Sequence, residues 1–327
     1  MQTEKKINVA LIGCGYWGKN LARIINEHPF TQLVVVCDQD ECRANSVAAS
    51  YGAIAFSTDF KITITNYNID AVVVASPVGT HYEVVKFALH NRKHVLCEKV
   101  LSTSSAQITE LIDDAKTNNL SLLVGHTFLY NSVVKYIKHA IDESHLGDLL
   151  HLTFKRTGLG PIREDVDVIT DLATHDLSIL TYWLGKPESI TTTARSYLVS
   201  SKADIAFVQC RYPNGIIADI QVSWLNPIKQ RMIEVVGSKQ MMIFDDVSTT
   251  EKLKIIQTGR DYQSQVKDFG SFQLSVKDGD IIIPRISYPE PLYEEFDDFV
   301  NSIKSGVLNH MTHSVAVSVA ESVESLK

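Results

Sequence analysis

The stretch INVALIGCGYWG, residues 7–18, joins a short apolar run to a glycine-rich loop. The run is rich in Val, Ile and Leu without polar alternation, as is typical of a strand covered on both faces, and helical periodicity follows the loop. Gly13, Gly15 and Gly18 therefore stand between a predicted strand and a predicted helix, which is the context that a dinucleotide-binding loop requires. The stretch predicts the first strand–loop–helix unit of a doubly wound sheet.

Each glycine of such a loop has its own task. The first permits a tight turn, the second lets a pyrophosphate approach the backbone, and the third lets helix and strand pack closely. The pyrophosphate then lies at the helix N-terminus, where unpaired amides and the helix dipole favour an anion.

Asp38 ends the second predicted strand, twenty positions after Gly18. A carboxylate at this place accepts hydrogen bonds from ribose hydroxyls and repels a 2′-phosphate, so NAD is expected in preference to NADP. The alternative is that the glycines are ordinary turns and that Asp38 caps a helix beginning near Glu41.

Strand-like and helical signals alternate through the first part of the chain. Further apolar runs lie at 33–37, 71–75, 94–97 and 120–124, separated by amphipathic stretches. This alternation predicts an α/β domain over residues 1–124, a Rossmann-type doubly wound parallel sheet.

Near residue 148 the pattern changes, because strand-like runs then follow one another with little helix between them. They lie at 149–154, 190–197, 205–212, 216–223, 232–236 and 241–244. The turn signal Pro213-Asn214-Gly215 predicts antiparallel neighbours, and helices are expected at Asp171–Leu184 and Pro291–Lys304. Residues 125–327 are therefore expected to form an α+β domain with an open, mostly antiparallel sheet, and the default ligand site is a cleft between the domains.

Composition narrows the class of protein. The chain has 327 residues with a net charge of −7 and no long Lys/Arg run, so a nucleic-acid partner is not expected. It has no apolar run of about 18 residues and a polar N-terminus, so neither a membrane span nor a signal peptide is expected. Its five cysteines fit neither a zinc site nor a disulfide framework. We expect a soluble, cytoplasmic protein without a metal site.

Four motifs in a fixed order carry a resemblance to one family. They are Ala75-Ser76-Pro77 followed by Thr80-His81, Cys97-Glu98-Lys99, Asp171-Leu172-Ala173-Thr174-His175-Asp176, and Pro291-Leu292-Tyr293-Glu294-Glu295-Phe296. Together with the glycine-rich loop they resemble the Gfo/Idh/MocA oxidoreductases over nearly the whole chain.

The resemblance implies NAD-dependent hydride transfer to or from a sugar. The pattern around His175 looks like that of members acting on nucleotide-linked or amino sugars; a free sugar or inositol is the alternative. Members of this family assemble through the open sheet, which implies a homodimer or homotetramer. The cofactor-side residues that it implies are Gly13, Gly15, Tyr16, Trp17, Gly18, Asp38, Ser76, Pro77, Thr80, His81, Glu98 and Lys99.

The chain departs from the family pattern in two places. Val100 stands where the family usually has proline after the lysine, in a peptide bond that is commonly cis. A cis bond before valine costs about 3–4 kcal/mol, so either packing offsets that cost or Lys99 is presented differently. Gly158 stands where sugar-acting relatives often have asparagine. Because the family includes non-catalytic regulators that sense a dinucleotide, such a regulator is the rival hypothesis.

Oxidation of an alcohol needs a base for the hydroxyl proton and a donor for the developing alkoxide. His175 suits the first task, and Asp171, four residues earlier, shares its helix face. Lys99 follows a strand whose end lies at the ligand-binding edge of the sheet, and it suits the second task. The alternatives are a helix histidine beside the core and a solvated lysine.

Other polar residues are candidates for binding substrate. His126 follows the sixth strand and is either a site residue or a plain loop residue. Arg156 and Arg163 flank the start of the second domain and are suited to a substrate phosphate, although surface arginines are common. The predicted substrate set is Lys99, His126, Arg156, Arg163, Asp171 and His175.

Overall fold

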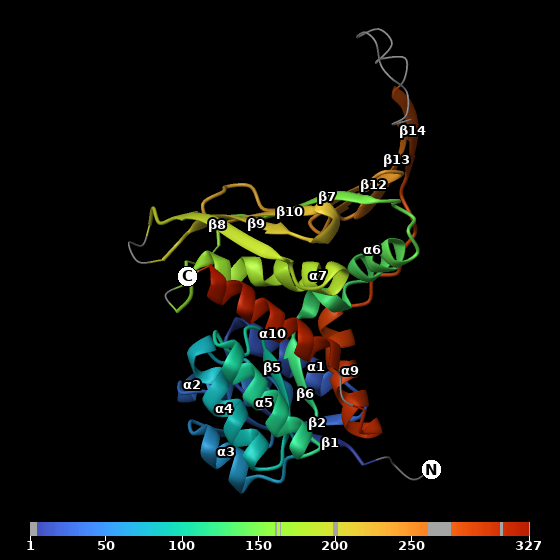
Figure 1. Ribbon diagram of the computed structural model, residues 1–327. Helices are drawn as coiled ribbons and strands as arrows, with labels where there is room; N and C mark the ends of the chain where they lie inside the picture. Colours follow the sequence, from blue (N-terminus) through green and yellow to red (C-terminus); the bar gives the residue numbers. More distant parts are fainter. Residues whose placement is uncertain are drawn as a thin grey trace. The chain divides into compact units, whose positions relative to one another are not determined.

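The computed structural model describes residues 5–160, 162–163, 165–198, 202–260, 276–307 and 310–326. The chain divides into two compact units (Figure 1). Unit 1 comprises residues 1–130 and 289–325, and unit 2 comprises residues 131–288. The expected boundary lay at 124/125, and in the structure residues 125–130 and 289–325 pack with the first unit. The reason is that a late helix buries Leu292, Phe296 and Phe299 in the core of that unit.

Unit 1 is built on a six-stranded parallel sheet in the order β3-β2-β1-β4-β5-β6. The strands are β1 (Ile7–Ile12), β2 (Thr31–Cys37), β3 (Ala55–Ser57), β4 (Ala71–Val74), β5 (His94–Glu98) and β6 (Leu122–Gly125). The strand order reverses between β1 and β4, so the carboxyl ends of these two strands mark the place where ligands bind in such sheets. The predicted doubly wound sheet is confirmed.

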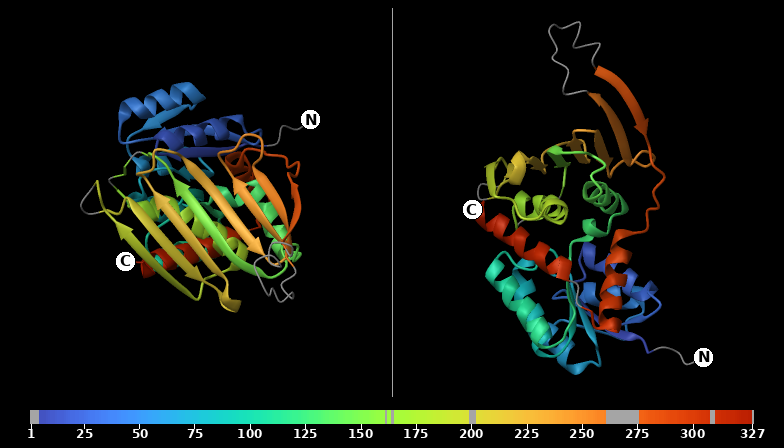
Figure 2. Two further views of the ribbon diagram at one scale, coloured as in Figure 1. Left: turned by 90° about the horizontal axis from the view of Figure 1, so that it is seen from above. Right: turned by 45° about the vertical axis from the view of Figure 1, so that its right-hand side comes forward.

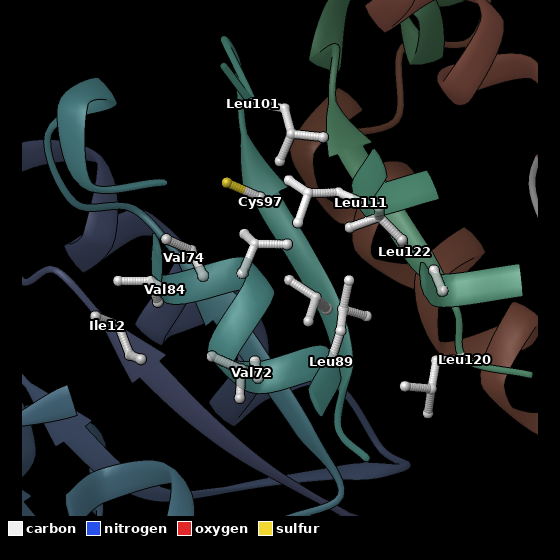
Figure 3. Close-up of a cluster of buried hydrophobic side chains, with 14 of the residues drawn as sticks. Ile12, Val72, Val74, Val84, Leu89, Cys97, Leu101, Leu111, Leu120 and Leu122 are labelled. Atoms are coloured by element: carbon white, nitrogen blue, oxygen red, sulfur yellow. The ribbon is translucent and has the colours of Figure 1, made fainter. Parts of the chain in front are cut away.

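Helices cover both faces of this sheet. They are α1 (Tyr16–Glu27), α2 (Glu41–Tyr51), α3 (Phe60–Asn66), α4 (Val78–His90), α5 (Ser105–Thr117), the 3₁₀ turn η1 (Thr127–Tyr130), α9 (Pro291–Ser305) and α10 (His310–Ser325). On one face α4, α5 and α10 pack on the strands, with Val84, Leu89 and Leu111 among the buried side chains (Figure 3). On the other face α1, α2 and α9 enclose a second core.

Unit 2 contains an eight-stranded sheet in the order β14-β13-β12-β11-β7-β10-β9-β8. The strands are β7 (Leu149–Thr157), β8 (Ser189–Arg195), β9 (Ile205–Arg211), β10 (Ile217–Ser223), β11 (Gln230–Gly237), β12 (Gln240–Asp245), β13 (Leu253–Arg260) and β14 (Val276–Ile282). Among the strands that the structure describes in unit 2, only β7 and β10 pair in parallel, so the expected open, mostly antiparallel sheet is confirmed. The expected turn at Pro213–Gly215 joins β9 to β10.

The two faces of this sheet differ. Helices α6 (Ser132–Asp142) and α7 (Thr174–Leu184) lie along one face (Figure 2), and the alternate residues Ala206, Val208 and Cys210 of β9 are buried. Between them in β9, Phe207 is 50% exposed, so the opposite face is open within unit 2.

Candidate active site

The glycine-rich loop has the geometry that its sequence predicts. Gly13 has φ +97°, and a Cβ there would lie 2.5 Å from the Ala75 and Ser76 backbone. A Cβ at Gly18 would lie 2.0 Å from the Gly13 carbonyl oxygen, whereas one at Gly15 would meet nothing within 4 Å. Two glycines are thus required by packing and the middle one faces open space. A cradle of this shape fits a pyrophosphate.

The N-terminus of α1 completes this cradle. Gly15 is the N-cap residue, no side chain caps the helix, and its first turn holds no acidic residue. The first amides therefore remain available to an anion. Tyr16 is 84% exposed at the same end of the helix.

Asp38 connects the end of β2 to the loop. Its Oδ2 accepts from the Cys14 amide at 2.8 Å and its Oδ1 from the Asp40 amide at 2.9 Å. Arg43 Nη1 lies 3.5 Å from Oδ1. The residue at the predicted ribose position therefore also shapes the loop, and it has a cation beside it that the sequence reasoning did not consider.

The loop after β4 brings together Ser76, Pro77 and Thr80. The Ser76 and Thr80 hydroxyl oxygens lie 2.7 Å apart, and Thr80 Oγ1 donates to the Pro77 carbonyl at 2.8 Å. His81 is buried, with Nδ1 2.8 Å from the Val100 carbonyl oxygen and Nε2 2.7 Å from that of Ser76. Since both ring nitrogens face backbone carbonyls, His81 joins the segments that follow β4 and β5. Its expected contact on the cofactor side stays a prediction.

Glu98 and Lys99 lie at the carboxyl end of β5. The Glu98 side chain is buried and accepts a hydrogen bond from Trp17 Nε1, so the glycine-rich loop and this strand end share a contact. Burial raises the pKa of Glu98 to about 7, although the Trp17 hydrogen bond and the neighbouring Lys99 charge oppose the rise. Lys99 is half-buried, and its peptide bond to Val100 is cis.

His126 lies at the end of β6 and is 1% exposed. Within the described part of the chain, neither ring nitrogen has a hydrogen-bond partner. Burial, assisted by the charge of Lys99, lowers the pKa of His126 to about 3, so its ring is neutral at physiological pH. A neutral imidazole with both nitrogens available remains a candidate for contacting a ligand.

In unit 2 Asp171 lies in a π-helical turn, Ile169–Ala173, directly before α7. Its carboxylate accepts from Arg163 Nη1 at 3.1 Å and from Trp224 Nε1 at 3.3 Å. Such turns occur frequently at functional sites. The sequence reasoning named Asp171 and Arg163 but missed Trp224, whose only signal was its position directly after a strand.

His175 lies half-buried in the first turn of α7.

Arg156, which was expected at the surface or at a substrate phosphate, is buried. Arg156 is 5% exposed and forms an ion pair with Asp176. Its Nε lies 3.1 Å from both carboxylate oxygens, and its Nη2 lies 2.6 Å from Oδ1. Because a buried guanidinium needs such a partner, this ion pair joins α7 to β7. The expected contact of Arg156 with a substrate phosphate stays a prediction.

Among the helices of the residues that the structure describes, none is long and apolar enough to cross a membrane. Within that described part of the chain, His, Cys, Asp and Glu side chains form no group of three or more that could hold a metal ion.

Comparisons with known proteins agree with this geometry. Residues 7–126 match a family model described as an oxidoreductase family with an NAD-binding Rossmann fold, and residues 134–243 match the GFO/IDH/MocA C-terminal domain.

Named relatives act on several sugars. Myo-inositol 2-dehydrogenase of Thermotoga maritima is 26% identical over 92% of this chain and 89% of its own. UDP-N-acetylglucosamine 3-dehydrogenase of Acidithiobacillus ferrooxidans is 28% identical over 66% of this chain and 67% of its own. The structure of levoglucosan dehydrogenase with NADH and levoglucosan aligns with a TM-score of 0.83 at 18% identity, over 98% of this chain and 96% of that one.

Proposed function

This chain belongs to the GFO/IDH/MocA family of NAD-binding oxidoreductases, and we propose that it acts on a secondary alcohol or ketone of a nucleotide-linked or amino sugar. The observation that carries the NAD-dependent part of the proposal is the open position at Gly15, flanked by two closely packed glycines at the switch point of the sheet. When bound, NAD supplies the hydride acceptor for alcohol oxidation.

Three residues carry the proposed chemistry. His175 takes the proton of the substrate hydroxyl, since an imidazole has a pKa near working pH. Lys99 donates to the same oxygen and stabilises its developing negative charge. Asp171, held by Arg163 and Trp224, orients His175 or a sugar hydroxyl.

The other predicted site residues are proposed to bind the cofactor or the sugar. Gly13, Gly15 and Gly18 hold the pyrophosphate, with Tyr16 and Trp17 beside it. Ser76, Pro77, Thr80 and Glu98 form the nicotinamide side by family resemblance. His126 and Arg163 are assigned to the sugar or its phosphate, because the first has two available ring nitrogens and the second already lies against Asp171.

The substrate class rests on the pattern around His175 and on a relative named as a UDP-N-acetylglucosamine dehydrogenase. The test is to add NAD and separate sugars to the purified protein and to follow NADH absorbance. Nucleotide-linked N-acetyl sugars should give NADH faster than myo-inositol or free aldoses. NAD binding without turnover on any sugar would instead support the non-catalytic regulator.

A second substrate class has its own support. The relative aligned over 92% of this chain is a myo-inositol dehydrogenase. Faster NADH formation with myo-inositol than with any nucleotide-linked sugar would assign the chain to that class.

Assembly is proposed through the open face of the sheet in unit 2. Phe207 and Ile217 are 50% and 37% exposed on strands whose alternate residues are buried. Placing a charge at Phe207 should then reduce the mass measured by light scattering to that of one chain; an unchanged mass would exclude this face.

A further inference from the structure

Unit 1 buries two glutamates whose positions meet at Gly125: the Glu295 carboxyl group and the Glu98 backbone both lie beside this glycine. Glu98 ends β5 and is 9% exposed, and Glu295 lies on α9 and is 0% exposed. A Cβ at Gly125 would meet Glu295 Oε1 at 3.0 Å and Glu98 Cα at 3.2 Å. Strands β5 and β6 and helix α9 therefore meet at these two acidic residues.

The two carboxyl groups have unequal partners. Glu98 accepts from Trp17 Nε1 and is followed in the chain by Lys99. In the described part of the structure, neither Glu295 oxygen makes a hydrogen bond of good geometry, although the Thr127 side chain beside it favours the ionised form to some extent. A hydrogen-bond donor and a cation therefore stabilise the ionised form of Glu98, whereas few groups stabilise the ionised form of Glu295.

The groups around Glu295 also disfavour a second negative charge. The charges acting on it come from Glu98 on β5 and Asp298 on its own helix, and both are negative. His126, at the end of β6, is neutral at physiological pH. Burial and then the Glu98 charge raise the pKa of Glu295 well above its ordinary value of 4.5. Two neighbouring buried carboxyl groups do not both ionise readily.

We propose that Glu295 is a positioning residue that keeps its proton, so that Glu98, held between Trp17 of the glycine-rich loop and Lys99, is the member of the pair that ionises. A proton on Glu295 removes the repulsion that would push the Glu98 side chain away from Trp17. Helix α9, more than 190 residues later in the sequence, thus helps to fix both the cofactor loop and the lysine. The activity readout rests on the proposed function, but the stability readout does not.

The test compares Glu295→Gln with wild type by thermal unfolding of the full chain across mildly acidic to mildly alkaline pH. The folded wild type holds a proton that the unfolded chain releases near pH 4.5. Its stability therefore falls as pH rises from that value through the raised folded-state pKa. Glutamine carries no titrating proton, so the Tm of Glu295→Gln should exceed that of wild type by an amount that grows with pH.

Two further variants complete the design. Glu294→Gln removes a carboxylate from the adjacent position on α9, which is only half-buried, and its Tm difference from wild type should not grow with pH. Glu295→Ala should lower Tm and weaken NAD binding, whereas Glu295→Gln should bind NAD as wild type does, because only the latter fills the same space without a charge.

The Tm of Glu295→Gln across pH decides between a protonated and an ionised Glu295. A Tm for Glu295→Gln below that of wild type by a constant amount at every pH, or a failure of this variant to fold, would mean that an ionised Glu295 is required and would overturn the proposal. A pH-dependent gain in Tm supports it even if no sugar gives NADH. The failure of the proposed function is therefore distinguishable from the failure of this inference.

Discussion

We propose that Asp38 has two tasks. Its carboxylate accepts from the Cys14 amide and so holds the glycine-rich loop, and it stands at the strand end where we expect the adenosine ribose to bind. Arg43, 3.5 Å away, is 47% exposed and offers a partner to an incoming phosphate. We therefore expect Arg43 to offset part of the repulsion between Asp38 and a 2′-phosphate.

We expect NAD to bind more tightly than NADP by about tenfold. Two like charges about 4 Å apart repel by roughly 4 kcal/mol at an intermediate dielectric, and Arg43 removes part of that repulsion. Calorimetric titration of both cofactors measures the difference. Arg43→Ala should widen the preference; equal affinities, or tighter NADP binding to wild type, would reject the role given to Asp38.

The buried ion pair of Arg156 and Asp176 is expected to stabilise the fold. Both side chains are nearly inaccessible, at 7% and 2% exposure. Removing one partner leaves an uncompensated buried charge, so Asp176→Ala should lower the free energy of unfolding by about 3–5 kcal/mol. Asp142→Ala, which removes an exposed i,i+4 pair with Lys138, should cost less than about 1 kcal/mol. Similar losses in denaturant unfolding of the two variants would contradict this assignment.

Single residues were predictable where backbone geometry decided them. The three glycines follow from sterics that any loop of this shape imposes, and Asp38 follows from its place at a strand end. The pairing of Arg156 with Asp176 was not predictable, because a sequence does not show which carboxylate will pair with a buried cation. Glu295 appeared only within a family motif, and its closeness to Glu98 depends on how a distant helix packs.

At the scale of elements, strands with continuous Val, Ile and Leu were the most predictable. β1 has the predicted bounds, and β2, β4, β5 and β6 differ by a few residues at most. β3 was missed because it has only three residues, none of them buried. α6 was also missed, although its buried residues Val133, Val134, Ile137 and Ala140 repeat at helical spacing.

The strand–loop–helix unit allows a matched pair of substitutions. Gly18→Ala should destabilise the fold, because its Cβ would lie 2.0 Å from the Gly13 carbonyl oxygen. Gly15→Ala should keep the Tm nearly unchanged, since its Cβ meets no protein atom within 4 Å, and should weaken NAD binding by occupying the pyrophosphate space. Melting curves with and without NAD check both expectations. Unchanged NAD affinity in Gly15→Ala would show that the cofactor does not approach this loop.

At the scale of the whole molecule, unit 2 interrupts unit 1 in the sequence. The chain leaves unit 1 near residue 130 and returns at residue 289, so α9 and α10 complete the core begun by the first strands. The two-domain class was predictable from length and from the change in pattern near residue 148. The return of the chain to unit 1 at residue 289 was not predictable. The periodicity of an amphipathic helix shows that the helix has a buried face, but it does not show against which core that face packs.

The central claim is that Lys99 and His175 together carry out the chemistry. The most direct test compares the turnover of wild type, Lys99→Ala, His175→Ala and the double variant on the best substrate. Each single substitution should lower kcat by about 10²–10⁴-fold while NAD affinity stays close to wild type. The double variant should lose little more than the worse single variant if both residues serve one proton path. Near-normal kcat in folded His175→Ala, accompanied only by a lower Tm, would contradict the proposed chemistry.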